Sequence, residues 1–122
     1  MTTAENFAVW SGLDPAALLD SDWVYFEHEE GGQVAAIAAV NGFEIHFAVN
    51  PSWRGRLLFR ERIRNFMRPL FEDRGFLTTR IVCDEDKLKN ARFVERLGFK
   101  HTHTENGVAH FMLSELPYSR GD

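Results

Sequence analysis

The sequence predicts a single α/β domain, of the α+β kind, in which a mixed and mainly antiparallel sheet is flanked by helices. Three observations support this fold class. A length of 122 residues suits one domain. Short turn signals separate apolar runs in the first half of the chain, which is typical of a β-meander. Two later segments repeat apolar residues with helical periodicity. The predicted order is a helix, three antiparallel strands, a helix, a strand, a helix and a hairpin.

We expect one domain over residues 1–122, with an N-terminal helical segment (1–21), a core (22–116) and a C-terminal tail (117–122). Within the first segment, a short helix is predicted over 14–19. Its first residues are an aspartate, which is a good capping residue, and a proline, which suits the first helical position.

Three strands are expected next, over 22–30, 33–40 and 43–49. Gly31-Gly32 and Asn41-Gly42 are predicted to be the two-residue turns between them. The middle strand is apolar at almost every position, which is typical of a sheet covered on both faces.

These turns predict the register of the meander. With two-residue loops, Ile37 lies opposite both Phe26 and His46, and Glu44 lies opposite Ala39. Glu44 and His46 then share a covered face, where small neighbours leave room for a bound group. Those neighbours are Ala35, Ala39 and Ala48. The residues expected to form core on the opposite face are Phe43, Ile45, Phe47 and Val49.

A long amphipathic helix is expected to follow, reaching about Asp73, with Pro69 kinking it or ending it early. One stripe of this helix is basic. It consists of Arg56, Arg60, Arg64 and Arg68.

The last third of the sequence predicts a strand over 78–83, an amphipathic helix over 86–97 and a hairpin over 99–113. Gly98 suits the left-handed position that follows a helix end, and Asn106-Gly107 suits a two-residue turn.

Composition excludes several classes of protein. Lys+Arg total 14 and Asp+Glu total 18, so the net charge is −4, which argues against binding to nucleic acid or anionic membranes. No apolar run reaches the ~20 residues of a membrane helix, and the N-terminus lacks the pattern of a signal peptide. We therefore expect a cytoplasmic protein.

Cys83 is the one cysteine and no metal-ligand spacing is present, so neither a disulfide nor a metal is expected.

Two stretches resemble the GNAT superfamily of N-acetyltransferases. F-E-I-H-F-A-V-N-P-S-W-R-G-R-L-L-F (43–59) is similar to the segment in which a strand ends in a Val-x-Pro loop and an Arg-Gly turn opens the long helix. N-A-R-F-V-E-R-L-G-F (90–99) is similar to the helix and strand that close these domains. The resemblance covers about 22–116. It implies the GNAT fold and transfer of an acetyl group from acetyl-CoA to an amine.

The resemblance also implies where acetyl-CoA binds as a cosubstrate. Backbone N–H groups from Val49 to Arg56 would receive the pyrophosphate at the start of the long helix. Arg54 matches the arginine of the family pattern, Arg56 would add charge, and Gly55 would permit close approach.

The sequence departs from the family pattern at three positions. Leu57 and Phe59 replace the two glycines of the phosphate loop, so this loop is degenerate. Val94 stands where the family often has the tyrosine that protonates the leaving sulfur.

Glu44 is the first candidate for the catalytic base and His46 is the second. A carboxylate on a covered face is expected to have its pKa raised by desolvation, toward the range that suits general base catalysis. The alternative interpretation is that the two side chains only satisfy each other within the sheet.

A narrower likeness suggests a different class of function. A-R-F-V-E-R-L-G and N-G-V-A-H-F-M-L are similar to small virion-associated, GNAT-like proteins of short-tailed phages. This likeness implies a non-catalytic virion or head-assembly protein with virion proteins as its partners.

Three histidines of the final hairpin form an alternative candidate site, for a metal ion. A two-residue turn predicts His103 opposite His110, with His101 on the same face, and three imidazoles can bind zinc or copper. A polar sheet face is the preferred interpretation, because the first strand of this hairpin is mostly polar.

Overall fold

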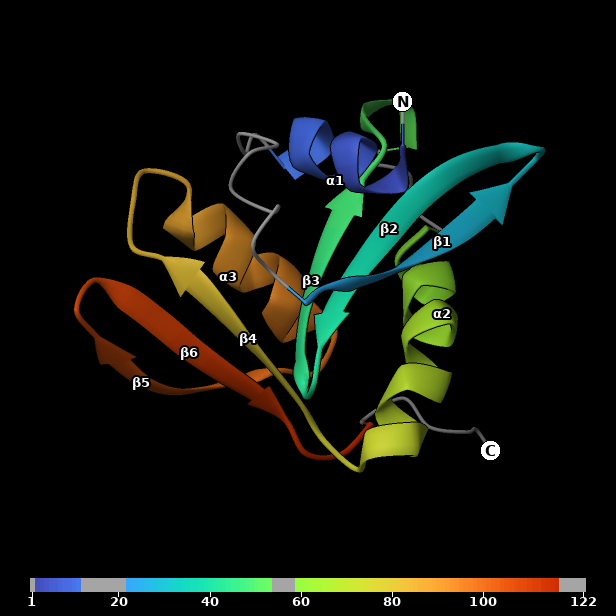
Figure 1. Cartoon of the computed structure of the whole chain (residues 1–122). Helices are drawn as coiled ribbons and strands as arrows, with labels where there is room; N and C mark the ends of the chain where they lie inside the picture. Colours follow the sequence, from blue (N-terminus) through green and yellow to red (C-terminus); the bar gives the residue numbers. More distant parts are fainter. Residues whose placement is uncertain (1, 12–21, 54–58, 117–122) are drawn as a thin grey trace. The chain divides into compact units, whose positions relative to one another are not determined.

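The computed structural model describes residues 2–11, 22–53 and 59–116 (Figure 1). Contacts divide the chain into two compact units, Met1–Phe66 and Met67–Asp122. The helix expected over 14–19 and the tail lie outside the described residues. A single domain over the whole chain stays a prediction.

The first unit begins with a helix and a three-stranded meander. Its elements are α1 (Thr3–Ser11), β1 (Val24–Glu30), β2 (Gln33–Asn41), β3 (Glu44–Val49), the short 3-10 helix η2 (Pro51–Trp53) and the first half of α2 (Phe59–Arg74). β2 pairs antiparallel with β1 and with β3.

The second unit contains the rest of α2 and a second set of three strands. Its other elements are β4 (Leu77–Val82), α3 (Lys87–Arg96), β5 (Lys100–Glu105) and β6 (Val108–Leu113). β6 pairs antiparallel with β4 and with β5. The predicted α/β class, with mainly antiparallel strands, is confirmed.

β2 is the core of the first unit. Each residue from Ala35 to Val40 is at most 2% exposed. Side chains alternate between the two faces of a strand, so burial of successive residues requires cover on both sides. α1 covers one face, where Phe7 packs on Ile37 and Ala39. α2 covers the other, where the Phe66 ring meets the ring of Phe47.

The helix α1 lies earlier in the chain than the helix expected over 14–19. Its start is a capping box: the Thr2 N–H donates to Glu5 Oε1 at 2.8 Å, and the Glu5 N–H donates to Thr2 Oγ1 at 3.1 Å. The bond from the Thr2 N–H lowers the pKa of the Glu5 carboxyl, because it stabilises the charged form. The T-x-x-E spacing is visible in the sequence and would have located this helix.

The register between β1 and β2 differs from the prediction beyond the turn. Glu30 pairs with Gln33, as the Gly31-Gly32 turn predicts, but a bulge follows between His28 and Glu29. One extra residue of β2 shifts all later pairs by one. Ile37 therefore lies opposite Glu27 and not opposite Phe26.

The β2–β3 register is also corrected, because the turn consists of Gly42-Phe43 and not of Asn41-Gly42. Asn41 pairs with Glu44, and His46 lies opposite Ala39. Gly42 has φ +62°. A glycine at the first central position suits a II′ turn, whereas the prediction assumed glycine at the second position of a I′ turn. Phe43 is consequently a turn residue, 47% exposed, and does not belong to the core.

α2 does not end early at Pro69, which lies inside it. A proline removes one backbone hydrogen bond from a helix. Burial of Met67 and Leu70, which flank the proline, compensates for this loss. The helix ends at Arg74, before Gly75 with φ +85°.

In the second unit, the Asn106-Gly107 turn places His103 opposite His110, as predicted. The two imidazole rings stack with centroids 4.4 Å apart. A register shift between His101 and His103 moves His101 opposite Phe111 and against its ring. His101 therefore does not share the face of the other two histidines, because one extra residue reverses the side-chain alternation.

We predict that Phe7→Ala destabilises the first unit by about 3–4 kcal/mol, because a 3% exposed ring leaves a cavity between α1 and the sheet. Urea unfolding followed by tryptophan fluorescence measures this loss, since Trp10, Trp23 and Trp53 all lie in this unit. Val9→Ala is the control on the same helix: Val9 is 56% exposed, and the expected change is below about 0.5 kcal/mol. Equal losses in the two variants would contradict the packing of α1.

Candidate functional site

Glu44 and His46 form a hydrogen-bonded pair at the start of β3. They are two residues apart on one strand, so their side chains point to the same face. His46 Nε2 lies 2.6 Å from Glu44 Oε2, and the imidazole is the donor because a carboxylate only accepts. The side chains of His46 and Glu44 are 30% and 22% exposed. The pair is therefore partly shielded and partly exposed to solvent.

The space expected beside this pair is filled by aromatic side chains. Phe7 packs on Ile37, Ala39 and Ala48. The residues packed around this cluster are Trp10, Trp23, Tyr25 and Val34. The Trp23 ring meets the His46 ring edge-on, with centroids 5.4 Å apart. The prediction that this space holds a bound group is therefore wrong for the side of Ala39 and Ala48, because Phe7 of α1 and the flanking aromatic residues occupy it.

Tyr25 lies in the same aromatic cluster as Phe7. The two ring centroids are 5.7 Å apart. Burial raises the pKa of the Tyr25 hydroxyl, because the phenolate form loses solvation. Tyr25 lies opposite Ala39, which lies opposite His46, so the neutral phenol is on the same face of the meander as the pair, one strand away from β3.

The loop after β3 uses its own N–H groups. Asn50 N–H donates to the Ala35 carbonyl at 2.9 Å, Trp53 N–H donates to the Asn50 carbonyl at 2.8 Å, and Ser52 N–H donates to Asn50 Oδ1 at 3.1 Å. Pro51 has no N–H. The expectation that N–H groups throughout this loop await a pyrophosphate is therefore wrong for residues 50–53, because Asn50 closes the turn.

The other predicted cofactor residues divide between the described and the undescribed parts of the chain. Val49 ends β3 and pairs with Ala36. Arg54, Gly55 and Arg56 lie outside the described residues. Phe59, which replaces one family glycine, is the first residue of α2.

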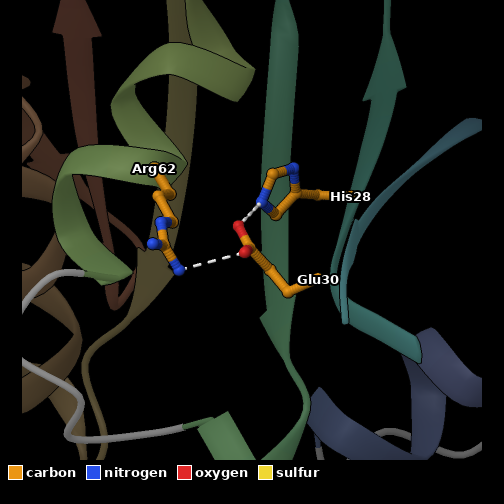
Figure 2. Close-up of polar contacts among 3 residues, drawn as sticks. All are labelled: His28, Glu30 and Arg62. Carbon is orange, nitrogen blue, oxygen red and sulfur yellow. Dashed lines mark hydrogen bonds and ion pairs between the residues drawn. The ribbon is translucent and has the colours of Figure 1, made fainter. Parts of the chain in front are cut away.

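A second polar cluster, which the sequence analysis missed, joins β1 to α2 (Figure 2). His28 Nε2 lies 2.6 Å from Glu30 Oε2, and Arg62 Nη1 lies 3.0 Å from Glu30 Oε1. The His28 ring also packs on the Phe66 ring, with centroids 5.4 Å apart. An H-x-E spacing on a predicted strand places both side chains on one face, and this signal would have indicated the pair.

The remaining candidates give no additional site. Among the described residues, no group of three or more His, Cys, Asp or Glu side chains is arranged to hold a metal ion. Val94 is 8% exposed on α3 and offers only carbon atoms at the position of the family's tyrosine. No helix in the described part of the chain is long and apolar enough to cross a membrane.

Several solved acetyltransferases share this fold, although no family profile matches the sequence and no curated protein is significantly similar to it. An acetyltransferase of Bacillus subtilis in complex with CoA superposes with a TM-score of 0.66, at 9% identity, over 93% of this chain and 91% of that one.

Two further structures agree. The N-acetyltransferase PseH of Campylobacter jejuni, in complex with acetyl coenzyme A, gives a TM-score of 0.60 at 13% identity, over 80% of this chain and 72% of that one. The ribosomal-protein-S18-alanine N-acetyltransferase of Escherichia coli gives a TM-score of 0.55 at 18% identity, over 88% of this chain and 79% of that one. The fold that the two sequence stretches implied is therefore confirmed, and this chain has the fold of the GNAT N-acetyltransferases.

Proposed function

We propose that this protein is an acetyl-CoA-dependent N-acetyltransferase that transfers an acetyl group to an amine. The observation that carries the proposal is the Glu44–His46 pair, partly exposed on the face of β3 in a chain with the fold of enzymes solved with CoA and acetyl-CoA. Such a pair supplies the proton acceptor that amine acetylation requires.

The chemistry assigned to the pair is proton removal. The lone pair of the neutral amine attacks the carbonyl carbon of the thioester, and Glu44 accepts the proton that the nitrogen loses as the carbon–nitrogen bond forms. The carbon–sulfur bond breaks and CoA leaves as a thiolate. His46 donates a hydrogen bond to Glu44 Oε2 and so holds the carboxylate in one orientation. His46 is the second candidate for the base, with Glu44 then orienting the imidazole.

The phosphate-binding role belongs, in this proposal, to Val49, Arg54, Gly55 and Arg56. Since the N–H groups of Asn50, Ser52 and Trp53 already have acceptors, side-chain charge would contribute more of the cofactor affinity than it does in a glycine-rich loop. The thiolate would be protonated by water, because Val94 cannot donate a proton.

A second candidate function is a non-catalytic one, in which the fold serves as a packing module among virion proteins. The filled aromatic face beside Glu44 and the bonded loop amides favour this alternative. Binding of acetyl-CoA separates the two proposals.

We predict that the chain binds acetyl-CoA in isothermal titration calorimetry, and that the double variant Arg54→Ala/Arg56→Ala weakens binding about tenfold or more through loss of charge-assisted contacts to phosphate. Arg92→Ala is the control. It removes one positive charge from an exposed position on α3 and should leave the affinity nearly unchanged. No heat from the wild-type protein at millimolar acetyl-CoA would favour the non-catalytic candidate.

We further predict that Glu44→Gln lowers kcat for amine acetylation by about 10²-fold or more, with little change in acetyl-CoA affinity, because the amide keeps the shape but cannot accept the proton. Steady-state kinetics and calorimetry measure the two effects. Glu95→Gln, an exposed change on α3, is the control. Unchanged kcat in Glu44→Gln would remove Glu44 from the mechanism. The pH dependence of the rate distinguishes the two candidate bases. If the decrease in kcat at low pH disappears in His46→Ala but persists in Glu44→Gln, the base is His46.

A further inference from the structure

We propose that Glu30 is a positioning residue, which holds the first turns of α2 on the end of β1 and thereby sets the cofactor-binding end of that helix. The cofactor part of this inference rests on the proposed function. The positioning itself concerns only contacts within the first unit, between β1 and the α2 residues up to Phe66.

Both oxygens of the Glu30 carboxylate are engaged, each by a different element. Oε1 accepts from Arg62 of α2, at 3.0 Å, and Oε2 accepts from His28 of β1, at 2.6 Å (Figure 2). The Glu30 side chain is 17% exposed, compared with 47% for Arg62. A shielded carboxylate with two charge-assisted partners is fixed more firmly than an exposed ion pair.

The position of Arg62 in the helix explains why it requires a partner. Arg62 is the fourth residue of α2, close to the N-terminus, where the helix dipole disfavours a cation. Glu30 offsets this unfavourable charge. It does so from β1, which is separated from Arg62 by more than thirty residues of chain.

A second contact acts on the next turn of the same helix face. Phe66 follows Arg62 by four residues, so both side chains point to the same side of α2. The Phe66 ring packs on His28, which also holds Glu30. Figure 2 shows His28, Glu30 and Arg62 of this cluster. Together with Phe66, they fasten two successive turns of α2 to the end of β1.

The position of this cluster links it to the cofactor site. Arg54, Gly55 and Arg56, to which the proposed function assigns the phosphates, stand three to five residues before Phe59, the first residue of α2. A shift of that turn would move the end of the phosphate-binding segment.

The test compares Glu30→Ala with Glu29→Ala. Glu29 is an exposed neighbour on the other face of β1, so the two variants lose the same charge at nearly the same place. We expect amide hydrogen exchange at residues 63–66 of α2 to become about fivefold faster in Glu30→Ala and to stay unchanged in Glu29→Ala. In an Arg62→Ala background, Glu30→Ala should cause no further change. Equal exchange in the two single variants, or an undiminished effect in the Arg62→Ala background, would overturn the proposal.

Acetyl-CoA affinity provides the second measurement, and the sign of the change is informative. If only charge mattered, removal of a carboxylate near an anion site would strengthen binding. Positioning predicts the opposite: a Kd about fivefold higher in Glu30→Ala and a Kd unchanged or lower in Glu29→Ala. Tighter binding by Glu30→Ala would overturn the cofactor part. If the wild-type chain binds no acetyl-CoA, the proposed function fails, and hydrogen exchange alone decides whether Glu30 holds α2.

Discussion

The first unit depends on the burial of β2. Six consecutive residues from Ala35 to Val40 are almost fully removed from water, which no strand with one open face can achieve. α1 must therefore cover one face and α2 the other. The small alanine side chains let α1 approach the sheet closely, and large side chains such as Phe7 and Phe66 fill the layers on the two faces.

This two-sided cover explains the different surroundings of the two glutamate–histidine pairs. Glu44 and His46 point to the face of α1, among Trp23 and the aromatic cluster. His28 and Glu30 point to the face of α2 and contact its first turns. Pairs of the same chemical kind thus have different proposed roles: one moves a proton, and the other holds a helix in place.

The loop after β3 shows how the chain satisfies its own backbone. N–H groups that are buried or lie in a turn require acceptors. Asn50 supplies two acceptors, its backbone carbonyl and its side-chain oxygen. Asn50 also donates from its side chain to the Val34 carbonyl. Its contacts tie the loop to the bulged start of β2. A loop closed in this way has fewer N–H groups available for phosphate, so in the proposed function arginine charge contributes a greater share of the binding.

The sequence by itself determined the fold class, the order of the strands and the helices after residue 22, and the two-sided burial of β2. These depend on local signals: alternation or continuity of apolar residues, glycine turns and helical periodicity. It also brought Glu44 and His46 to one face, because their separation of two residues is independent of register.

Tertiary structure decided the rest. A bulge near His28, and a turn centred on Gly42-Phe43, changed which residues oppose each other, since a one-residue difference is nearly neutral locally but decisive for packing. Only the packing of α1 filled the space beside Glu44, and only the approach of α2 to β1 brought Arg62 to Glu30, because contacts between distant segments leave no periodic signal in the sequence.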